Sequence, residues 1–345
     1  MSPVEMYASV NQILEQLDFN ALFEGFKKYR FALYNSKEIV LDGITMPYQE
    51  DFRGNTSIKY EGEHIAIWNL EFDPIDDLEE LAYLLTHEMF HCHQRANNET
   101  RYPSDLELLN YPDDIGNFIS KYNENRYLAD ACEQRDLKLL EKFAHIREMR
   151  YLVYPFMVGQ ELKVETIEGM AEYVGLKALE QINVEKYNAI IGNYIEKLRA
   201  EGNLLFDIRR ISYFTGALFF ICLDLFGHPV KNAFDRETTA YEQNRITSAR
   251  DTVEIQPYSF IERNYAKLSR DKENTIDEHI KRSEFVACNA GICGYDPMNM
   301  FRVEDVVFCS HFVFLNQNDE AKIIDSAVVL KMAEGSNDRI VGYYL

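Results

Sequence analysis

The string His87-Glu88-Met89-Phe90-His91 combines the residue types and the spacing of a metal-binding helix. Residues four apart lie on one face of an α-helix, so the imidazoles of His87 and His91 can bind a single ion. Glu88 follows about 100° further around the helix axis, where its carboxylate can reach a water molecule on the metal without binding the metal. The string therefore predicts a Zn2+ site with His87 and His91 as ligands and Glu88 as the general base of a hydrolysis.

A catalytic zinc site also needs a third protein ligand and one open position. His93 lies only two residues after His91 and points away from the ligand face. The metzincin pattern, H-E-x-x-H-x-x-G-x-x-H, is excluded because positions 94 and 97 are Gln and Asn. The third ligand is therefore expected from a more distant part of the chain.

Glu168 and Glu172 stand four residues apart in a later stretch with helical periodicity. Two carboxylates on one helix face repel each other mildly. A cation and an imidazole N–H close to the pair would relieve this repulsion. Gly169 and Gly175 are small enough to let this helix approach the helix of His87 closely.

The H-E-x-x-H string and the string from Glu168 to Tyr173, E-G-M-A-E-Y, resemble the gluzincin metallopeptidases, the thermolysin-like group. In that group a Glu on a downstream helix completes the zinc site. The resemblance implies that Glu168 is the third zinc ligand and that Glu172 hydrogen-bonds a ligand His. It also implies that the strand before the metal helix, residues 64–70, is an edge strand that pairs with extended peptide substrate. An inserted helical segment, at about 100–160, must then fold out and return.

A hydrolytic site also needs a group that stabilises the developing oxyanion. Tyr213 lies at the start of a buried helix and is the candidate for this role, although a tyrosine in the core is an equally good interpretation. Arg209 and Arg210 could bind a substrate carboxylate, but a surface position is the more ordinary expectation for them.

The periodicity of apolar residues predicts an α+β fold. A mostly helical, zincin-like body carries the site, with a small mixed sheet before it and a β-rich unit after it. We expect three units: residues 1–75, 76–262, and 263–345 with a linker helix at their start. Asp76 and Glu79 are expected to cap the metal helix. Further elements are expected as helices at 1–35, 123–150, 164–181, 184–200, 205–226 and 263–284, and as strands at 38–41, 57–60, 64–68, 306–308, 311–314, 323–324 and 327–330.

Charge and cysteine usage limit the partners and the compartment. The formal net charge of −21 disfavours binding to nucleic acid or to an anionic membrane surface. The longest apolar stretch, 213–226, is shorter than the ~20 residues of a membrane helix. No targeting signal is visible, and the six cysteines lack the spacing of a disulfide scaffold, which predicts a cytoplasmic protein. A second zinc site among the cysteines and His311 of residues 288–311 is not favoured, because their spacing fits no zinc ribbon.

The leading hypothesis is a zinc metallopeptidase that acts on a peptide or protein substrate. A di-iron carboxylate protein is a weaker alternative, because such proteins need two E-x-x-H motifs and only Glu88 to His91 provides one. A non-catalytic metal-binding or interaction protein that keeps a zincin fold is the remaining alternative. Retention of Glu88 favours catalysis, since a structural zinc site needs no general base.

Overall fold

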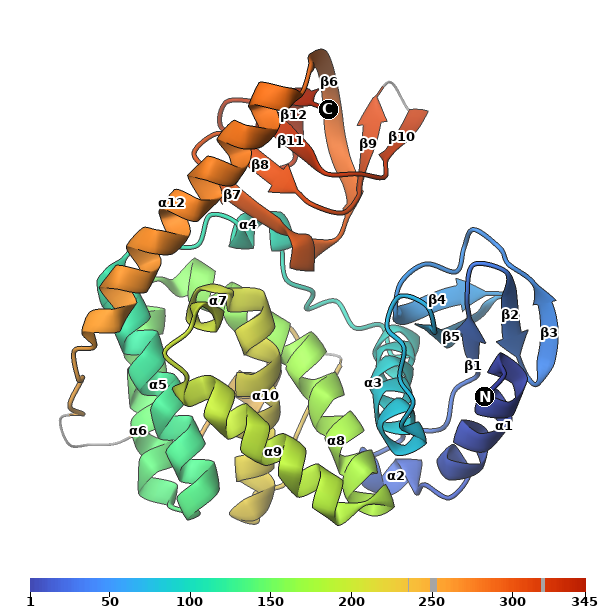
Figure 1. Ribbon diagram of the computed structural model, residues 1–345. Coiled ribbons are helices and arrows are strands. Elements are labelled where there is room, and N and C mark those ends of the chain that lie inside the picture. Colours follow the sequence, from blue (N-terminus) through green and yellow to red (C-terminus); the bar gives the residue numbers. More distant parts are fainter. Residues whose placement is uncertain (235, 249–252, 318–319) are drawn as a thin grey trace.

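The computed structural model describes residues 1–234, 236–248, 253–317 and 320–345. Figure 1 shows a sheet near the N-terminus, a helical middle, and a second sheet that is joined to the helices by the long α12. This arrangement confirms the predicted α+β class. The division into three units at the stated boundaries remains a prediction.

The N-terminal sheet is mixed, as predicted. Within the described residues its order is β3-β2-β1-β5-β4, with β1 and β5 parallel and the other pairs antiparallel. Strand β5 therefore lies inside the sheet, and the expectation that residues 64–70 form an edge strand is wrong. The edge on that side is β4, which precedes β5 and pairs with it. The bounds are α1 (Pro3–Leu14), α2 (Phe19–Leu22), β1 (Phe31–Tyr34), β2 (Glu38–Leu41), β3 (Ile44–Pro47), β4 (Thr56–Tyr60) and β5 (Glu63–Asn69).

The helix predicted over residues 1–35 is shorter than expected. Residues 31–34 form β1, and all four of them are buried. This run, Phe-Ala-Leu-Tyr, is short and wholly apolar, and a run of that kind fits a buried strand as well as a helix.

Helix α3 (Leu78–Ala96) packs against this sheet through Leu81, Leu85 and Met89, all fully buried. It begins one residue later than predicted. Asp77, not Asp76, is the N-cap, and its carboxylate accepts hydrogen bonds from the backbone N–H groups of Glu79 and Glu80.

The helical middle surrounds the apolar α10, which runs through its centre (Figure 1). The single helix predicted at 123–150 is two helices, because Arg135 adopts a left-handed conformation (φ 51°) that ends α5. The bounds are α4 (Asp105–Leu108), α5 (Ile115–Gln134), α6 (Leu137–Val153), α7 (Pro155–Val164), a π-helical turn (Glu165–Gly169), α8 (Met170–Ile182), α9 (Val184–Arg199), a 3-10 turn (Asn203–Phe206), α10 (Ile208–Leu225), α11 (Ala240–Gln243) and α12 (Ser259–Arg282).

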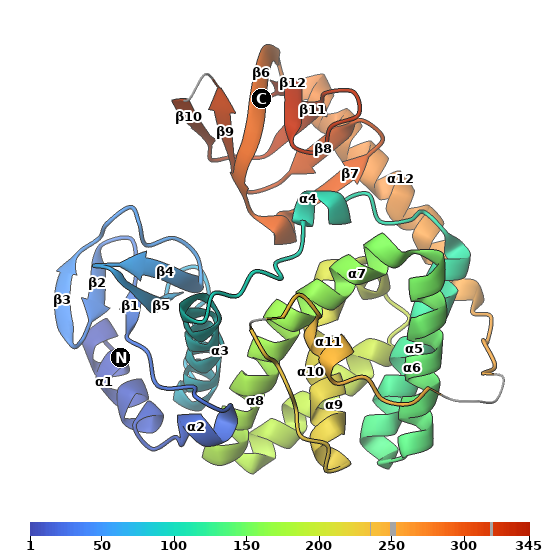
Figure 2. The same cartoon turned by 180° about the vertical axis from the view of Figure 1, so that it is seen from behind.

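The C-terminal sheet is antiparallel, and in the described part of the chain its order is β10-β9-β6-β12-β11-β8-β7. Figure 2 shows the segment after α3 running to α4 beneath this sheet, and Leu106 of α4 belongs to the sheet's apolar core. The sequence prediction missed β6, β7 and β12. The bounds are β6 (Phe285–Tyr295), a 3-10 turn (Pro297–Asn299), β7 (Met300–Val303), β8 (Val306–Cys309), β9 (Val313–Gln317), β10 (Glu320–Ile324), β11 (Val328–Met332) and β12 (Arg339–Tyr344).

None of the helices in the described ranges combines the length and the apolar character needed to cross a bilayer.

Candidate metal centre

Two neighbouring helices carry the predicted site residues. His87, Glu88 and His91 lie on α3, and Glu168 lies in the π-helical turn between α7 and α8. Turns of this kind are rare and occur frequently at functional sites. No pattern in the sequence predicted this turn. The helix expected at 164–181 does not begin at 164, because α7, the π-helical turn and α8 follow one another without a break.

Glycines allow close helix packing around this turn. A Cβ on Gly175 would lie 3.0 Å from the ring of Tyr83 on α3, so this glycine lets α8 approach α3, as expected. Gly169 faces a different neighbour. A Cβ there would lie 2.7 Å from the Cα of Gly216, so the π-helical turn and α10 touch backbone to backbone. Glu168 is therefore held on a turn that cannot shift toward α10.

The side chains of His87, His91 and Glu168 converge on one point. The two Nε2 atoms are 3.1 Å apart, and Oε2 of Glu168 lies 3.2 Å from Nε2 of His91 and 3.8 Å from Nε2 of His87. Ligands around a tetrahedral zinc ion, at about 2.0–2.1 Å from it, are separated by about 3.3 Å. The three groups could therefore hold one metal ion.

The outer nitrogen of each imidazole has a hydrogen-bond acceptor. Nδ1 of His87 lies 2.9 Å from Oε2 of Glu172, and Nδ1 of His91 lies 2.7 Å from Oε1 of Gln94. The Gln94 amide is oriented by its own donation to the carbonyl oxygen of Ile167. Each Nδ1 is therefore the protonated nitrogen, and each Nε2 presents a lone pair to the carboxylate of Glu168. Three acceptors that face one another require a positive charge between them.

The raised pKa of His87 also indicates that the surrounding acceptors favour a positive charge at this position. Burial alone would lower this pKa, but hydrogen bonds with Glu168 and Glu172 outweigh burial and raise it to about 10. A proton thus satisfies the acceptors in the metal-free protein, and a metal ion would have to displace that proton.

Glu172 is fixed by more than His87. The hydroxyls of Tyr83 on α3 and Tyr194 on α9 both donate to its Oε1. Burial raises the pKa of Glu172, yet the hydrogen bonds from His87 and the two tyrosines bring it below its ordinary value. Glu172 is therefore an ionised acceptor that orients the His87 ring.

Glu88 and Tyr213 lie beside this group of acceptors. Glu88 is buried, and burial raises the pKa of its carboxyl group. Among the described residues, no side chain forms a hydrogen bond or an ion pair with it. The ring of Tyr213 stacks on the ring of His87, with centroids 6.2 Å apart and planes 6° apart. The pKa of Tyr213 is raised well above its ordinary value, first by burial and then by the charge of Glu168, so its hydroxyl remains a proton donor.

Arg209 is not the surface residue that the sequence suggested. Its side chain is only 14% exposed, donates to Oε1 of Glu168 at 2.9 Å, and forms an ion pair with Asp105. One oxygen of Glu168 is thereby held by Arg209, and the other is left to face the imidazoles. Arg210 is at the surface, as expected, and pairs with Asp207.

Several residues of this surrounding shell were missed in the sequence. Tyr83 and Gln94 carried a usable signal, because they lie four residues before His87 and three after His91 on the metal helix. Tyr194, Asp105 and Arg209 are brought in by tertiary packing, and no local pattern marks them.

Other histidines and cysteines do not add to the site. His93 packs in an aromatic group with Phe23, Phe26 and Phe90, where burial lowers its pKa to about 4. Within the described ranges, His87, His91 and Glu168 are the one group of at least three potential ligands with atoms close enough to share an ion.

Comparisons with protein-family models, with curated proteins and with solved structures found no match. We therefore infer the chemistry of the site from its own geometry.

Proposed function

We propose that this protein is a zinc-dependent hydrolase, and more specifically a metallopeptidase similar to the gluzincins. The observation that carries the proposal is the convergence of two Nε2 lone pairs and one Glu168 oxygen on a single point. Two imidazoles and one carboxylate are the ligand set of several catalytic zinc sites, which keep a further position open.

His87, His91 and Glu168 would hold the zinc ion. When bound, zinc would polarise the scissile carbonyl and lower the pKa of a water molecule. Glu88, a buried carboxyl group beside the ligands, would take a proton from the attacking water and pass it to the leaving amine. Tyr213 would donate a hydrogen bond to the carbonyl oxygen as negative charge develops there.

Glu172 and Arg209 would act through the ligands. Glu172 would keep the His87 ring in the tautomer that presents Nε2 inward. Arg209 would fix the orientation of the Glu168 carboxylate. Both are positioning residues in this scheme.

The free edge of β4 is where an extended peptide would add to the N-terminal sheet. In the described residues β4 is hydrogen-bonded to another strand, β5, on one side only. Strand addition would give the substrate main-chain hydrogen bonds without selecting particular side chains.

Metal analysis of the purified protein tests the zinc site. We expect one zinc per chain in the wild type and loss of zinc in Glu168→Ala. Glu180→Ala, on the exposed side of α8, is the matched control and should keep its zinc. Equal zinc content in Glu168→Ala and wild type would overturn the assigned ligand set.

Hydrolysis of a quenched fluorescent peptide library tests the chemistry. A peptidase should lose cleavage in Glu88→Gln while it keeps zinc. If wild-type protein loaded with zinc cleaves no peptide and Glu88→Gln matches it in zinc content and stability, the non-catalytic metal-binding alternative is the correct one.

A further inference from the structure

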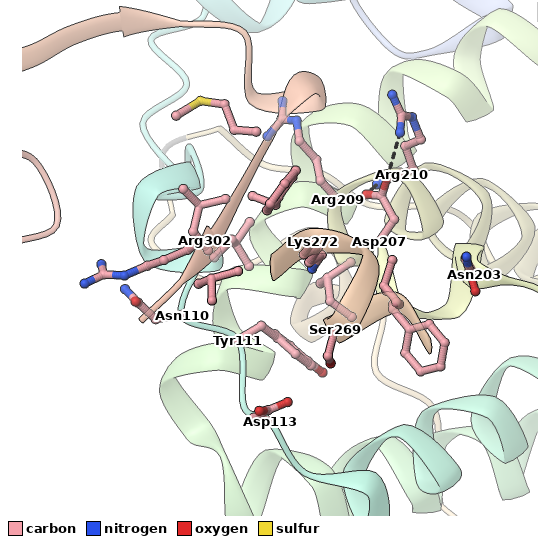
Figure 3. Close-up of a pocket in the computed structure, with 18 of the residues that line it drawn as sticks. Asn110, Tyr111, Asp113, Asn203, Asp207, Arg209, Arg210, Ser269, Lys272 and Arg302 are labelled. Atoms are coloured by element: carbon pink, nitrogen blue, oxygen red, sulfur yellow. Dashed lines mark hydrogen bonds and ion pairs between the residues drawn. The ribbon is translucent and has the colours of Figure 1, made fainter. Parts of the chain in front are cut away.

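A second region of interest is a cavity of about 740 Å³ between the helical middle and the C-terminal sheet. Helix α12 forms one wall, and the 3-10 turn before α10 and the turn before β7 form others. Figure 3 shows 18 of the residues that line it. Arg209 and Asp105 lie on its boundary, and Arg209 also pairs with Glu168 of the metal centre.

One wall of this cavity is aromatic. Phe118, Phe206 and Tyr265 pack against one another, with ring centroids 5.0 to 5.4 Å apart. Leu108, Leu268 and Met300 add aliphatic surface to the lining. Such a wall suits the flat apolar body of a small molecule.

The arginines at the cavity already have partners. In Figure 3 the side chain of Arg302 points away from Lys272. The ion pairs and hydrogen bonds join Arg209 to Asp105 and Glu168, Arg210 to Asp207, and Arg302 to Asn337 and the backbone of Glu304.

Lys272 differs from these arginines. It shares a face of α12 with Tyr265, Leu268 and Ser269, and all four line the cavity. In the described part of the chain its ammonium has no hydrogen bond and no ion pair, and its Nζ lies 5.7 Å from the ring centroid of Phe301. Burial lowers the pKa of Lys272, and the more distant Asp207 and Asp113 compensate only in part. A half-buried ammonium that contacts an aromatic ring but no anion attracts an anion.

We propose that this cavity binds a small organic monoanion. One carboxylate or sulfonate group pairs with Lys272, and a flat apolar body lies against Phe118, Phe206 and Tyr265. A polyanion such as a nucleotide is disfavoured, because among the described residues Lys272 is the one cation of the lining that has neither an ion pair nor a hydrogen bond. The exposed carboxylates of Asp113, Glu273 and Glu304 also line the cavity and would repel further negative charge.

Isothermal titration calorimetry with naphthalene-2-sulfonate tests this proposal on the full-length protein. We expect saturable binding at one site per chain, with a Kd that rises about tenfold or more in Lys272→Met, because a charge-assisted hydrogen bond is lost. Lys272→Arg should keep most of the affinity. Lys267→Met, an exposed lysine on the same helix, should bind as the wild type does.

Two controls keep the test decisive. Circular dichroism and metal content should be unchanged in Lys272→Met, which separates the cavity from the metal centre. ATP should fail to displace naphthalene-2-sulfonate, whereas 2-naphthoate should displace it. Absence of binding by the wild type, equal binding by Lys272→Met, or displacement by ATP as effective as by 2-naphthoate would each overturn the proposal.

Discussion

Two groups of buried charges lie within one helical turn of each other, and they are balanced differently. In the first, Glu165 belongs to a network in which three cations meet three carboxylates. In the second, Glu168 faces two imidazoles, and Glu88 and Glu172 lie nearby. Among the described side chains, Arg209 is the one permanent cation that forms an ion pair with this group. The network members are Lys121, Arg147 and Arg150 with Glu124, Glu161 and Glu165, all less than 3% exposed.

The two groups also differ in what burial does to their carboxyl groups. Burial raises the pKa of Glu124, but Arg150 and Arg147 outweigh this and bring it below its ordinary value. Burial raises the pKa of Glu88, and the nearby charges of His87, His91 and Arg95 offset this only in part. A network that satisfies its own charges holds a fold together, whereas a group with excess acceptors could hold a cation from outside.

The largest effect is expected from removing one cation of the buried network of three cations and three carboxylates. Arg147→Met leaves Glu124 and Glu165 buried without their shared partner, which should cost about 3–5 kcal/mol of unfolding free energy. Urea denaturation measures this cost. Arg282→Met, which removes a largely exposed arginine, should cost less than about 0.5 kcal/mol. A loss below about 1 kcal/mol for Arg147→Met would mean that the network is not structural.

The group formed by His87, His91 and Glu168 should instead be stabilised by added metal. Zinc at 100 times its Kd should stabilise the folded protein by about 2.7 kcal/mol, because the ion binds only the folded state. Thermal unfolding with and without zinc measures the shift. His91→Ala should abolish it, while His228→Ala, at an exposed position, should leave it intact. An equal shift in both variants would place the zinc elsewhere.

The same substitution should have opposite signs in the two groups. In chelator-treated protein at pH 7, Glu88→Gln should raise the unfolding free energy by about 0.5–2 kcal/mol, because it removes a buried carboxyl group that forms no hydrogen bond or ion pair among the described residues and whose pKa burial raises. Glu124→Gln should lower it, because Arg147 and Arg150 lose an ionised partner. Denaturant midpoints that move in the same direction would contradict this contrast.

The smallest effect is expected in the outer shell of the site. Tyr194→Phe removes one of the two hydroxyls that donate to Glu172, which should weaken zinc binding by about 1 kcal/mol, or about fivefold. Competition with a zinc indicator measures the affinity. Tyr187→Phe, on the same helix but without a hydrogen bond to the site in the described structure, should leave the zinc affinity unchanged. A loss as large in Tyr187→Phe would point to a general effect of α9.

Local spacing was enough to predict His87, Glu88 and His91 as neighbours, because the periodicity of one helix places them. The pair Glu168 and Glu172 could be proposed for the same reason, although only the fold brings them to α3. The network could not be foreseen. Lys121, Arg147 and Arg150 have the composition of a solvated helix, and their burial follows from partners on other helices. Arg209 was misjudged for this reason as well, since Glu168 lies 41 residues before it.

The π-helical turn gives the two buried groups a common support. Glu165 bonds to Arg147 and Thr215 on one side of the chain, while Glu168, three residues later, faces α3. A rotation of this segment that improved one set of contacts would weaken the other. The backbone of Gly216 on α10 also prevents the segment from moving toward α10. Loss of a single residue from the turn would therefore rotate the carboxylates that follow it, Glu168 and Glu172 among them, about the helix axis and away from α3. Insertions and deletions should be tolerated less in this turn than in the loops of the helical middle.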